Sequence, residues 1–405
     1  MALYNSDCRN PLEDLEKAFD TSLEDGTWPG VVVAATNKSG SFHYAKAFGN
    51  DDGTSDGRPL AMSSIMALAS MSKLLTSIAA LQLVEKRIVD LETDVSSLLP
   101  KLASQGVLCD WDAAGQPCIQ PRKNPITLRS LLTHSSGAGY DMSNPNLARF
   151  TAYKGRNVNS GTTVDERFGY PLTFEPDTAW EYGTGIDWVG QLVERLTGQT
   201  LEAYMQRHIW EPLGIEKMSF WPARLSGGDR KVRISVRDEA SGRFTALKQL
   251  FLTEGVTDCF GGQGIHASME EFLKVIHSIL SDDGKLLTSE SIAMMFQSQL
   301  LPASRDSLQR HIKECDPQSS FIGIFDNNRL YDWGLGGMLA MENEPFGPQA
   351  KTLFWSGKPN LFWFIDRESD ICGVLGTQFL PPGDRKVARM IEVFQTKIYE
   401  ARCNF

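Results

Sequence analysis

The pattern of hydrophobic and polar positions near the start of the chain predicts a helix, a hairpin and a second helix. Apolar residues recur at i, i+3 and i+4 spacing over residues 11–26, as they do on an amphipathic helix. Two apolar stretches, 31–35 and 41–48, flank turn-forming residues 37–40 and predict an antiparallel hairpin. A helix with a buried apolar stripe is then predicted over residues 70–87.

The middle of the chain, from about residue 90 to about residue 220, is predicted to be mostly helical with long loops. Helical periodicity is clearest at residues 128–133, 185–197 and 201–209. Residues 141–175 are polar and are expected to be irregular.

Strand patterns return toward the C-terminal end of the chain. Residues 232–236 predict a strand and residues 269–280 predict a helix. Two further apolar runs, 361–366 and 371–379, predict a second hairpin, and residues 385–401 predict a terminal helix.

This order of elements predicts an α+β fold. An antiparallel sheet built from both ends of the chain carries N- and C-terminal helices, and a mostly helical domain is inserted between its strands. The predicted boundaries are residues 1–90 and 220–405 for the α/β sheet domain and 91–219 for the inserted domain.

Composition and charge narrow the classes of partner. The chain has 405 residues, of which 41% are apolar, so it has ample material for a core. Its 40 Lys and Arg against 50 Asp and Glu give a net charge of −10 without any basic run, which disfavours nucleic acid and anionic membranes as partners. Neither an apolar stretch of about 20 residues nor a secretory signal is found, so a cytoplasmic protein is expected.

The cysteines and histidines do not follow a metal-binding pattern. Seven cysteines are scattered without a CxxC pair, and the six histidines show no HExxH spacing. Reduced thiols are the simplest interpretation, and no metal is expected. Cys109 and Cys118 are the one close pair, on either side of a predicted loop or turn, and a disulfide between them is the less favoured alternative.

The most informative segment for chemistry places Ser70 and Lys73 three residues apart at the start of a predicted helix. This spacing puts both side chains on one face of the helix. A serine at a helix N-terminus lies beside free N–H groups, which favour a developing oxyanion. A lysine whose pKa is lowered by burial or nearby positive potential can remove the serine proton, so the pair forms a complete nucleophile and base.

The same four letters also have a plain structural interpretation. An SxxK sequence arises by chance about once in a chain of this length, so the motif alone is weak evidence. Ser70 is then a helix N-cap, and Lys73 is a solvated residue of the first turn.

Tyr182 and His134 are candidate partners of this pair. Tyr182 lies in a glycine-containing turn before the predicted helix 185–197, where its phenol could shuttle protons, although packing its ring and capping a turn is the commoner role. His134 invites a triad with Ser70, but Lys73 already supplies a base and no acidic orienter is evident. His134 is therefore interpreted as structural.

A further candidate lies ahead of the predicted strand 361–366. Trp355, Ser356 and Gly357 lead toward it, and a strand edge with small residues permits close approach of a ligand to the backbone. One N–H group there completes an oxyanion hole with the N–H of Ser70. The alternative is a plain turn.

Taken together, these segments resemble the serine β-lactamase/transpeptidase-like superfamily. The matching segments, in the superfamily's order, are Ser70-Met71-Ser72-Lys73, residues 131–137, Tyr182, Gly261-Gly262-Gln263-Gly264 and Gly334-Leu335-Gly336-Gly337. More narrowly, over roughly residues 11–400 the chain resembles the fungal acyltransferases, or transesterases, of polyketide biosynthesis, whose type case attaches the methylbutyryl side chain in lovastatin production.

The resemblance implies roles for individual residues. Ser70 is implied as the acylated nucleophile, with Lys73 and Tyr182 as the proton-handling pair. The backbone N–H groups of Ser70 and Lys358 are implied as the oxyanion hole. The Asn of the Tyr-x-Asn motif that assists amide recognition is absent, because Tyr182 is followed by Gly-Thr.

Five residues are assigned to substrate binding. Tyr140 and Arg167 fall where the related statin acyltransferase has pocket residues. Trp355, Ser356 and Gly357 replace the Lys-Thr-Gly of lactamases and transpeptidases, so the charged group that holds a substrate carboxylate is missing. Ester or thioester chemistry is therefore favoured over lactam chemistry.

The resemblance implies a serine acyltransferase that needs no cofactor. An acyl group passes from a thioester donor, carried by an acyl carrier protein or a small thiol, to Ser70 and then to the hydroxyl of a polyketide-like small molecule. Two alternatives stay open. An esterase or thioesterase uses the same residues with water as the acceptor, and a catalytically silent relative only binds a ligand.

Overall fold

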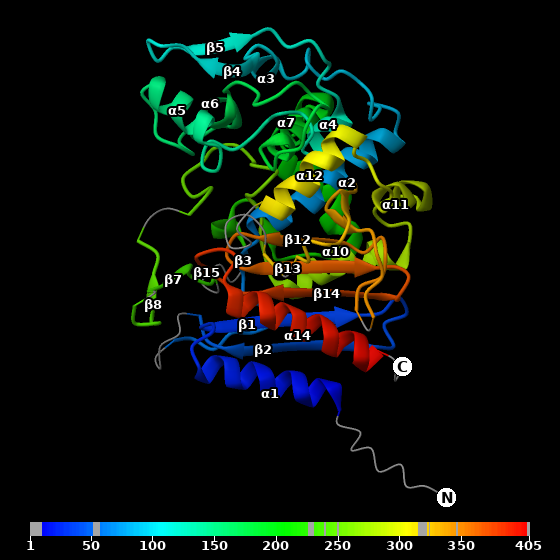
Figure 1. Cartoon of the computed structure of the whole chain (residues 1–405). Coiled ribbons are helices and arrows are strands. Elements are labelled where there is room, and N and C mark those ends of the chain that lie inside the picture. The colour runs from blue at the N-terminus through cyan, green and yellow to red at the C-terminus, as the bar shows by residue number, and fades with distance from the viewer. Residues whose placement is uncertain are drawn as a thin grey trace, which may run out of the picture.

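A seven-stranded antiparallel sheet forms the lower half of the molecule in the view of Figure 1. The computed structural model describes residues 10–51, 57–225, 231–238, 240–248, 251–314, 322–323, 325–345 and 347–402. The strand order is β10-β11-β12-β13-β14-β1-β2. The strands are β1 (Gly30–Thr36), β2 (His43–Gly49), β10 (Tyr331–Trp333), β11 (Met338–Ala340), β12 (Leu353–Gly357), β13 (Leu361–Asp366) and β14 (Ile371–Gly376).

The two predicted hairpins, β1–β2 and β13–β14, meet in the middle of this sheet. Strand β1 pairs antiparallel with β14, with Val32 opposite Gly376 and Thr36 opposite Cys372. The first and last strands of this sheet in chain order are therefore neighbours. The prediction of an α+β fold with an antiparallel sheet from both chain ends is confirmed.

Each face of the sheet is covered by helices, and alternate residues of β1 pack to opposite sides. Val31 and Val33 join an apolar cluster with α1 (Pro11–Glu24) and α14 (Arg385–Arg402), whereas Val32 packs into a second cluster on the other face. Helix α10 (Met269–Ser281) lies against that second face (Figure 1). This alternation, with both faces buried, explains why β1 is apolar throughout.

The remaining elements lie mostly between β2 and β10 in the chain. The helices are η1 (Ala69–Met71), α2 (Ser72–Glu85), α3 (Pro100–Ala103), α4 (Leu128–Leu132), α5 (Pro145–Tyr153), α6 (Val164–Phe168), α7 (Gly185–Thr197), α8 (Leu201–Met205), η2 (Gln206–Trp210), α9 (Glu211–Leu213), η3 (Pro222–Arg224), α11 (Ser289–Met295) and α12 (Pro302–Glu314). The short strands are β3 (Met66–Ala67), β4 (Val107–Trp111), β5 (Pro117–Gln120), β6 (Met218–Ser219), β7 (Ser235–Arg237), β8 (Phe244–Ala246), β9 (His266–Ala267) and β15 (Phe379–Leu380).

The structure differs from the prediction in two parts of the middle region. Two helices, α5 and α6, stand where an irregular segment was expected, and both begin with side-chain caps, from Asn144 and Thr163. Strands β4 and β5 form a hairpin in a region expected to be mostly helical. The loop or turn predicted between Cys109 and Cys118 is the turn of this hairpin, and both cysteines are free thiols. The division into two domains at residues 91 and 219 stays a prediction.

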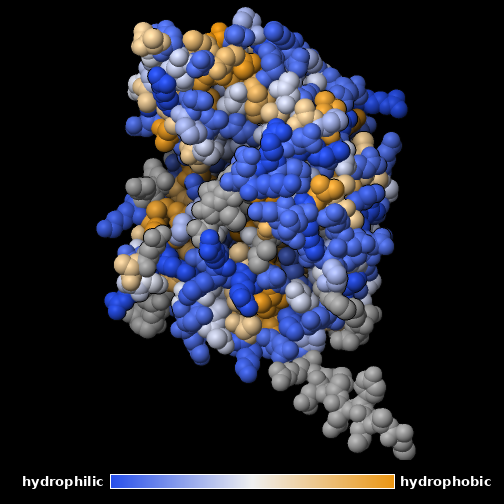
Figure 2. All heavy atoms as spheres, viewed as in Figure 1, coloured by the Kyte–Doolittle hydropathy of each residue, from blue (hydrophilic) through white to orange (hydrophobic). Residues whose placement is uncertain are grey.

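Polar residues dominate the surface on the side shown in Figure 2, with smaller apolar patches mainly in its upper part. Apolar side chains are instead concentrated on the two faces of the sheet and around α2. Among the described residues, no helix is long and apolar enough to cross a membrane.

Candidate active site

Ser70 lies where the short helix η1 joins α2. Ala69, directly before it, has φ of +47°, a conformation that an alanine adopts only with strain, and such strain is concentrated at functional sites. Neither η1 nor α2 begins with a hydrogen bond from a capping side chain. The interpretation of Ser70 as an ordinary N-cap is therefore not supported by the geometry.

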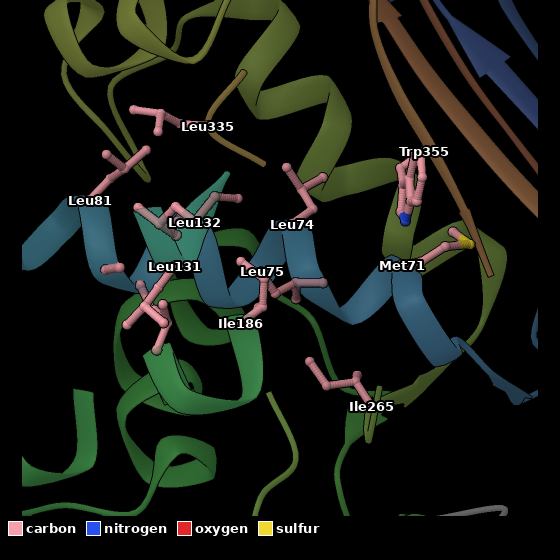
Figure 3. Packing of buried hydrophobic residues seen from close by; sticks show 14 of the residues in the cluster. Met71, Leu74, Leu75, Leu81, Leu131, Leu132, Ile186, Ile265, Leu335 and Trp355 are labelled. Carbon is pink, nitrogen blue, oxygen red and sulfur yellow. The ribbon is translucent and has the colours of Figure 1, made fainter. Parts of the chain in front are cut away.

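Helix α2 is buried on all sides, not only along one stripe as predicted. Every residue of α2 from Ser72 to Leu83 is buried. Figure 3 shows its apolar side chains among those of neighbouring elements, including Leu131 and Ile186, with Trp355 of β12 near the start of the helix. Packing on all sides holds the first turn of α2 rigidly, which is what a preorganised nucleophile requires.

Lys73 is a buried cation whose amine contacts three groups. Its side chain is 2% exposed, and its Nζ lies 3.3 Å from Ser70 Oγ, 3.2 Å from Tyr140 Oη and 2.8 Å from the carbonyl oxygen of Gly262. The ammonium thus donates its three hydrogens to three acceptors. The predicted proximity of Lys73 and Ser70 is present in the structure.

Behind Lys73 lies a buried carboxylate that the sequence prediction did not include. Tyr140 donates its phenol proton to Asp187 Oδ2 at 3.3 Å, and the N–H of Gly262 donates to Asp187 Oδ1 at 2.9 Å. Burial raises the pKa of Asp187, and the charge of Lys73 opposes that rise. Burial also raises the pKa of Tyr140 well above 10.0, with the charge of Asp187 acting in the same direction.

Tyr182 reaches the site from the turn before α7. Lys73 Nζ lies 4.7 Å from the centre of its ring, and its hydroxyl accepts a hydrogen bond from Trp355 Nε1 at 3.1 Å. Trp355 is 3% exposed, and its ring packs against Trp333 with 4.7 Å between centroids. The groups that pack around the Tyr182 hydroxyl are therefore aromatic and uncharged.

Strand β12 brings the third predicted segment next to the nucleophile. A Cβ atom on Gly357 would lie 2.3 Å from the carbonyl oxygen of Leu68, so only glycine permits this approach between β12 and the chain ahead of η1. Ser356 is buried in β12, and Lys358 is the first residue after this strand. Burial lowers the pKa of Lys358, whose amine points to the sulfur of Met142 at 3.8 Å.

Arg167 is not brought into contact with Ser70, Lys73 or Tyr182 by any of the described interactions. Its guanidinium donates to the carbonyl oxygens of Gly161 and Leu252, the latter at 2.7 Å. These bonds hold the guanidinium in place, and its role in substrate binding stays a prediction.

His134 supports the Tyr182 turn, and none of the described interactions joins it to Ser70. Its Nδ1 accepts the N–H of Gly183 at 3.2 Å, and its ring lies 4.7 Å from that of Tyr182 and 4.9 Å from that of Trp333. Burial lowers the pKa of His134 well below 6.5, and the charge of Lys73 adds to that effect, so the imidazole is neutral. This geometry favours the structural interpretation over a Ser70–His134 triad.

Replacing His134 with alanine is expected to reduce stability more than chemistry. Losing a packed ring and the acceptor for the Gly183 N–H costs about 2–4 kcal/mol. Because the folded pKa lies below 6.5, His134 adds stability above pH 6.5 that is lost as the pH falls. Thermal unfolding at several pH values should therefore show a lower Tm and a weaker acid dependence in the variant. A loss of rate at unchanged Tm would contradict the structural role.

The described residues contain no group of three or more His, Cys, Asp or Glu side chains placed to hold a metal ion.

Asp187 was missed because an acidic residue in the first turn of a helix is usually an exposed group that interacts with the helix dipole. Its apolar neighbours Ile186 and Trp188 were the available signal that this first turn is buried.

Comparison with known proteins gives near full-length matches. The family model described as Beta-lactamase matches residues 15–396. The chain is 35% identical over 396 residues to Lovastatin esterase from Penicillium rubens, covering 95% of this chain and 98% of the relative. It is 33% identical over 401 residues to Monacolin J acid methylbutanoyltransferase from Aspergillus terreus, covering 96% of each.

A solved structure shows the same fold. The LovD6 mutant of simvastatin synthase (LovD) from Aspergillus terreus superposes with a TM-score of 0.92 at 34% identity, covering 98% of this chain and 96% of that one. The similar proteins thus include both acyl-transferring and ester-hydrolysing enzymes.

Proposed function

The chain belongs to the beta-lactamase family, in the group that holds fungal serine acyltransferases and esterases, and we propose that it is an acyltransferase acting on a polyketide-like alcohol. The observation that carries this proposal is the Ser70–Lys73 pair in a chain similar over nearly its whole length to methylbutanoyltransferases. The acyl donor is a thioester, on a carrier protein or on a small thiol.

The proposed reaction has two displacements. Ser70 Oγ attacks the thioester carbonyl while the Ser70 hydroxyl proton passes to the amine of Lys73. The backbone N–H groups of Ser70 and Lys358 bind the oxyanion that forms. The carbon–sulfur bond then breaks, and the thiol leaves with a proton delivered through Lys73 and Tyr182. In the second displacement the acceptor hydroxyl attacks the acyl-Ser70 ester, and its proton follows the same path in reverse.

The aromatic, uncharged residues at the site favour an alcohol as the acceptor. Water is present at about 55 M, so an alcohol competes only when it is held in attack geometry, where effective molarities of about 10⁵ M or more are accessible. Trp355 stands where lactamases and transpeptidases have the charged lysine of Lys-Thr-Gly, and it packs against Trp333 as a buried aromatic pair. An apolar wall retains a polyketide-like ring system and sheds water.

We expect slow hydrolysis of a short acyl thioester by the enzyme alone, and faster thiol release when the correct alcohol is added. Thiol release and product mass, measured with and without a panel of polyketide-like alcohols, test this expectation. The product should be the ester of the alcohol, and a Ser70→Ala preparation supplies the background rate.

The competing function is ester hydrolysis, which is favoured by the 35% identity to Lovastatin esterase. That function would be established instead by fast hydrolysis of the thioester with no acyl transfer to any alcohol in the panel, together with cleavage of a polyketide ester. Both functions form the same acyl-Ser70, so the acceptor alone separates them.

A further inference from the structure

A chain of two hydrogen bonds runs from Lys73, beside the nucleophile, into the protein interior, and both donors point toward Asp187. Lys73 Nζ donates to Tyr140 Oη at 3.2 Å, and Tyr140 Oη donates to Asp187 Oδ2 at 3.3 Å. At the other end, Lys73 contacts Ser70 Oγ at 3.3 Å. The side chains of Lys73 and Tyr140 are 2% and 6% exposed, and that of Asp187 is fully buried.

One peptide group fixes both ends of this chain. The carbonyl oxygen of Gly262 accepts from Lys73 at 2.8 Å, and its N–H donates to Asp187 Oδ1 at 2.9 Å. A Cβ atom on Gly262 would lie 2.4 Å from Asp187 Oδ2, so a residue without a side chain is required there. The ammonium and the carboxylate are thus held at a set separation with Tyr140 between them.

We propose that Asp187 is a positioning residue that takes up the proton that Lys73 must lose before it can act as the base for Ser70. In this step one proton moves from Lys73 Nζ to Tyr140 Oη while the Tyr140 proton moves to Asp187 Oδ2. An ammonium and a carboxylate become an amine and a carboxylic acid, so the buried site keeps its net charge and no proton enters from solvent. The inference rests on the proposed acyl-Ser70 mechanism.

The amine then accepts the proton of Ser70 as Oγ bonds to the acyl carbon. When the thioester carbon–sulfur bond breaks, a proton from Lys73 neutralises the leaving sulfur, and the Asp187 proton returns through Tyr140. Every proton is accounted for within the site. Burial, which disfavours separated charges, makes the neutral amine and acid pair more accessible than it is in water.

Several other charged or titratable groups surround this relay. Asp187, Tyr140 or Lys73 interacts electrostatically with four of them: Arg167 from α6, Tyr170, Tyr182 and His134. Arg167 and Lys73 favour the ionised form of Asp187 and burial opposes it. None of these groups continues the direct hydrogen-bonded line from Lys73 to Asp187 among the described interactions.

The test is the pH dependence of Ser70 acylation in Asp187→Asn. An asparagine keeps an acceptor for the Gly262 N–H but cannot accept a proton. The burst of nitrophenolate from a p-nitrophenyl ester measures acylation from about pH 5.5 to about pH 9.5. We expect acylation of the variant near neutral pH to fall at least about tenfold and to recover toward high pH, where hydroxide replaces Asp187 as the final proton acceptor.

Two further variants separate the relay from a structural role. Tyr140→Phe removes the middle of the relay and leaves the Asp187–Gly262 bond, so it should lose a similar factor, and the double variant should lose little more. Glu181→Gln is the matched control, because this half-buried carboxylate accepts hydrogen bonds from Thr173 and Asn144 rather than from Tyr140, and the change should leave acylation unchanged. Acylation rates in mixtures of H₂O and D₂O should curve in the wild type, where several protons move, and be linear in Tyr140→Phe.

Three outcomes would overturn the proposal. Asp187→Asn acylation that is unchanged or faster near neutral pH would make Asp187 only a counterion. A lower Tm of Asp187→Asn with an unchanged acylation rate constant would show that Asp187 is only structural. The same conclusion would follow if the acylation rate depended on the D₂O fraction identically in the wild type and all variants. A wild-type protein that forms no acyl-Ser70 would instead remove the proposed function, so the two failures are distinguishable.

Discussion

Replacing Ser70 with alanine is expected to abolish turnover, with a loss of at least about 10⁴-fold in acyl transfer. Among the described residues, Lys73 and Tyr140 beside Ser70 are hydrogen-bonded to each other, so neither is expected to replace it as the nucleophile. The measurement is the mass of the intact protein after incubation with an acyl thioester. The adduct should appear on the wild type and be absent from the variant.

The fold should survive this change. Within the described residues, Ser70 Oγ accepts a hydrogen bond from Lys73, and neither η1 nor α2 begins with a side-chain cap. The expected cost is below about 1 kcal/mol, which moves Tm by no more than about 4 °C in a chain of this size.

Ser72→Ala is the matched control for this prediction. Ser72 Oγ accepts the buried N–H of Ile265 at 3.1 Å, so its loss costs about 1–3 kcal/mol while Ser70 stays in place. The control should therefore have a lower Tm and still form the adduct. Turnover that persists in Ser70→Ala at an unchanged rate would disprove the assignment of the nucleophile.

Removing the amine of Lys73 or the hydroxyl of Tyr182 is expected to slow Ser70 acylation by about 10²–10⁴-fold each. Lys73→Met keeps the length of the buried side chain but leaves Gly262 and Tyr140 without their donor. Tyr182→Phe keeps the ring that faces Lys73 and removes only the group that binds Trp355 Nε1. Burst kinetics with an activated ester measure both rates.

The combined loss should be far smaller than the product of the two, because the residues act on one proton path. Lys86→Met is the control for the lysine change, since Lys86 is the C-cap residue of the same helix α2 and also lies against a tyrosine. Its Nζ is 3.3 Å from Tyr204 Oη. Its acylation rate should equal that of the wild type. Fully multiplicative losses in Lys73→Met and Tyr182→Phe would instead indicate that Tyr182 only positions the substrate.

Local patterns were sufficient for the elements that depend on neighbours in the chain. The periodicity over residues 185–197 predicted α7, and the alternation and turn around residues 361–379 predicted the β13–β14 hairpin. Helix periods and hairpin turns are set by contacts within a few residues, so a single sequence carries that information. The SxxK spacing likewise places Ser70 and Lys73 on one face without knowledge of the rest of the molecule.

Only the tertiary structure decided which distant groups complete the site. Lys73 meets Gly262 across 189 residues of sequence, and Tyr140 meets Asp187 across 47. These contacts follow from packing α2 against α7 and from pairing β3, which precedes η1, with β9, which follows the Gly262 segment. The local pattern around Asp187 is that of an ordinary first helical turn, and burial alone turns this carboxylate into a partner for a buried lysine, because a charge removed from water must find its counter-charge inside the protein.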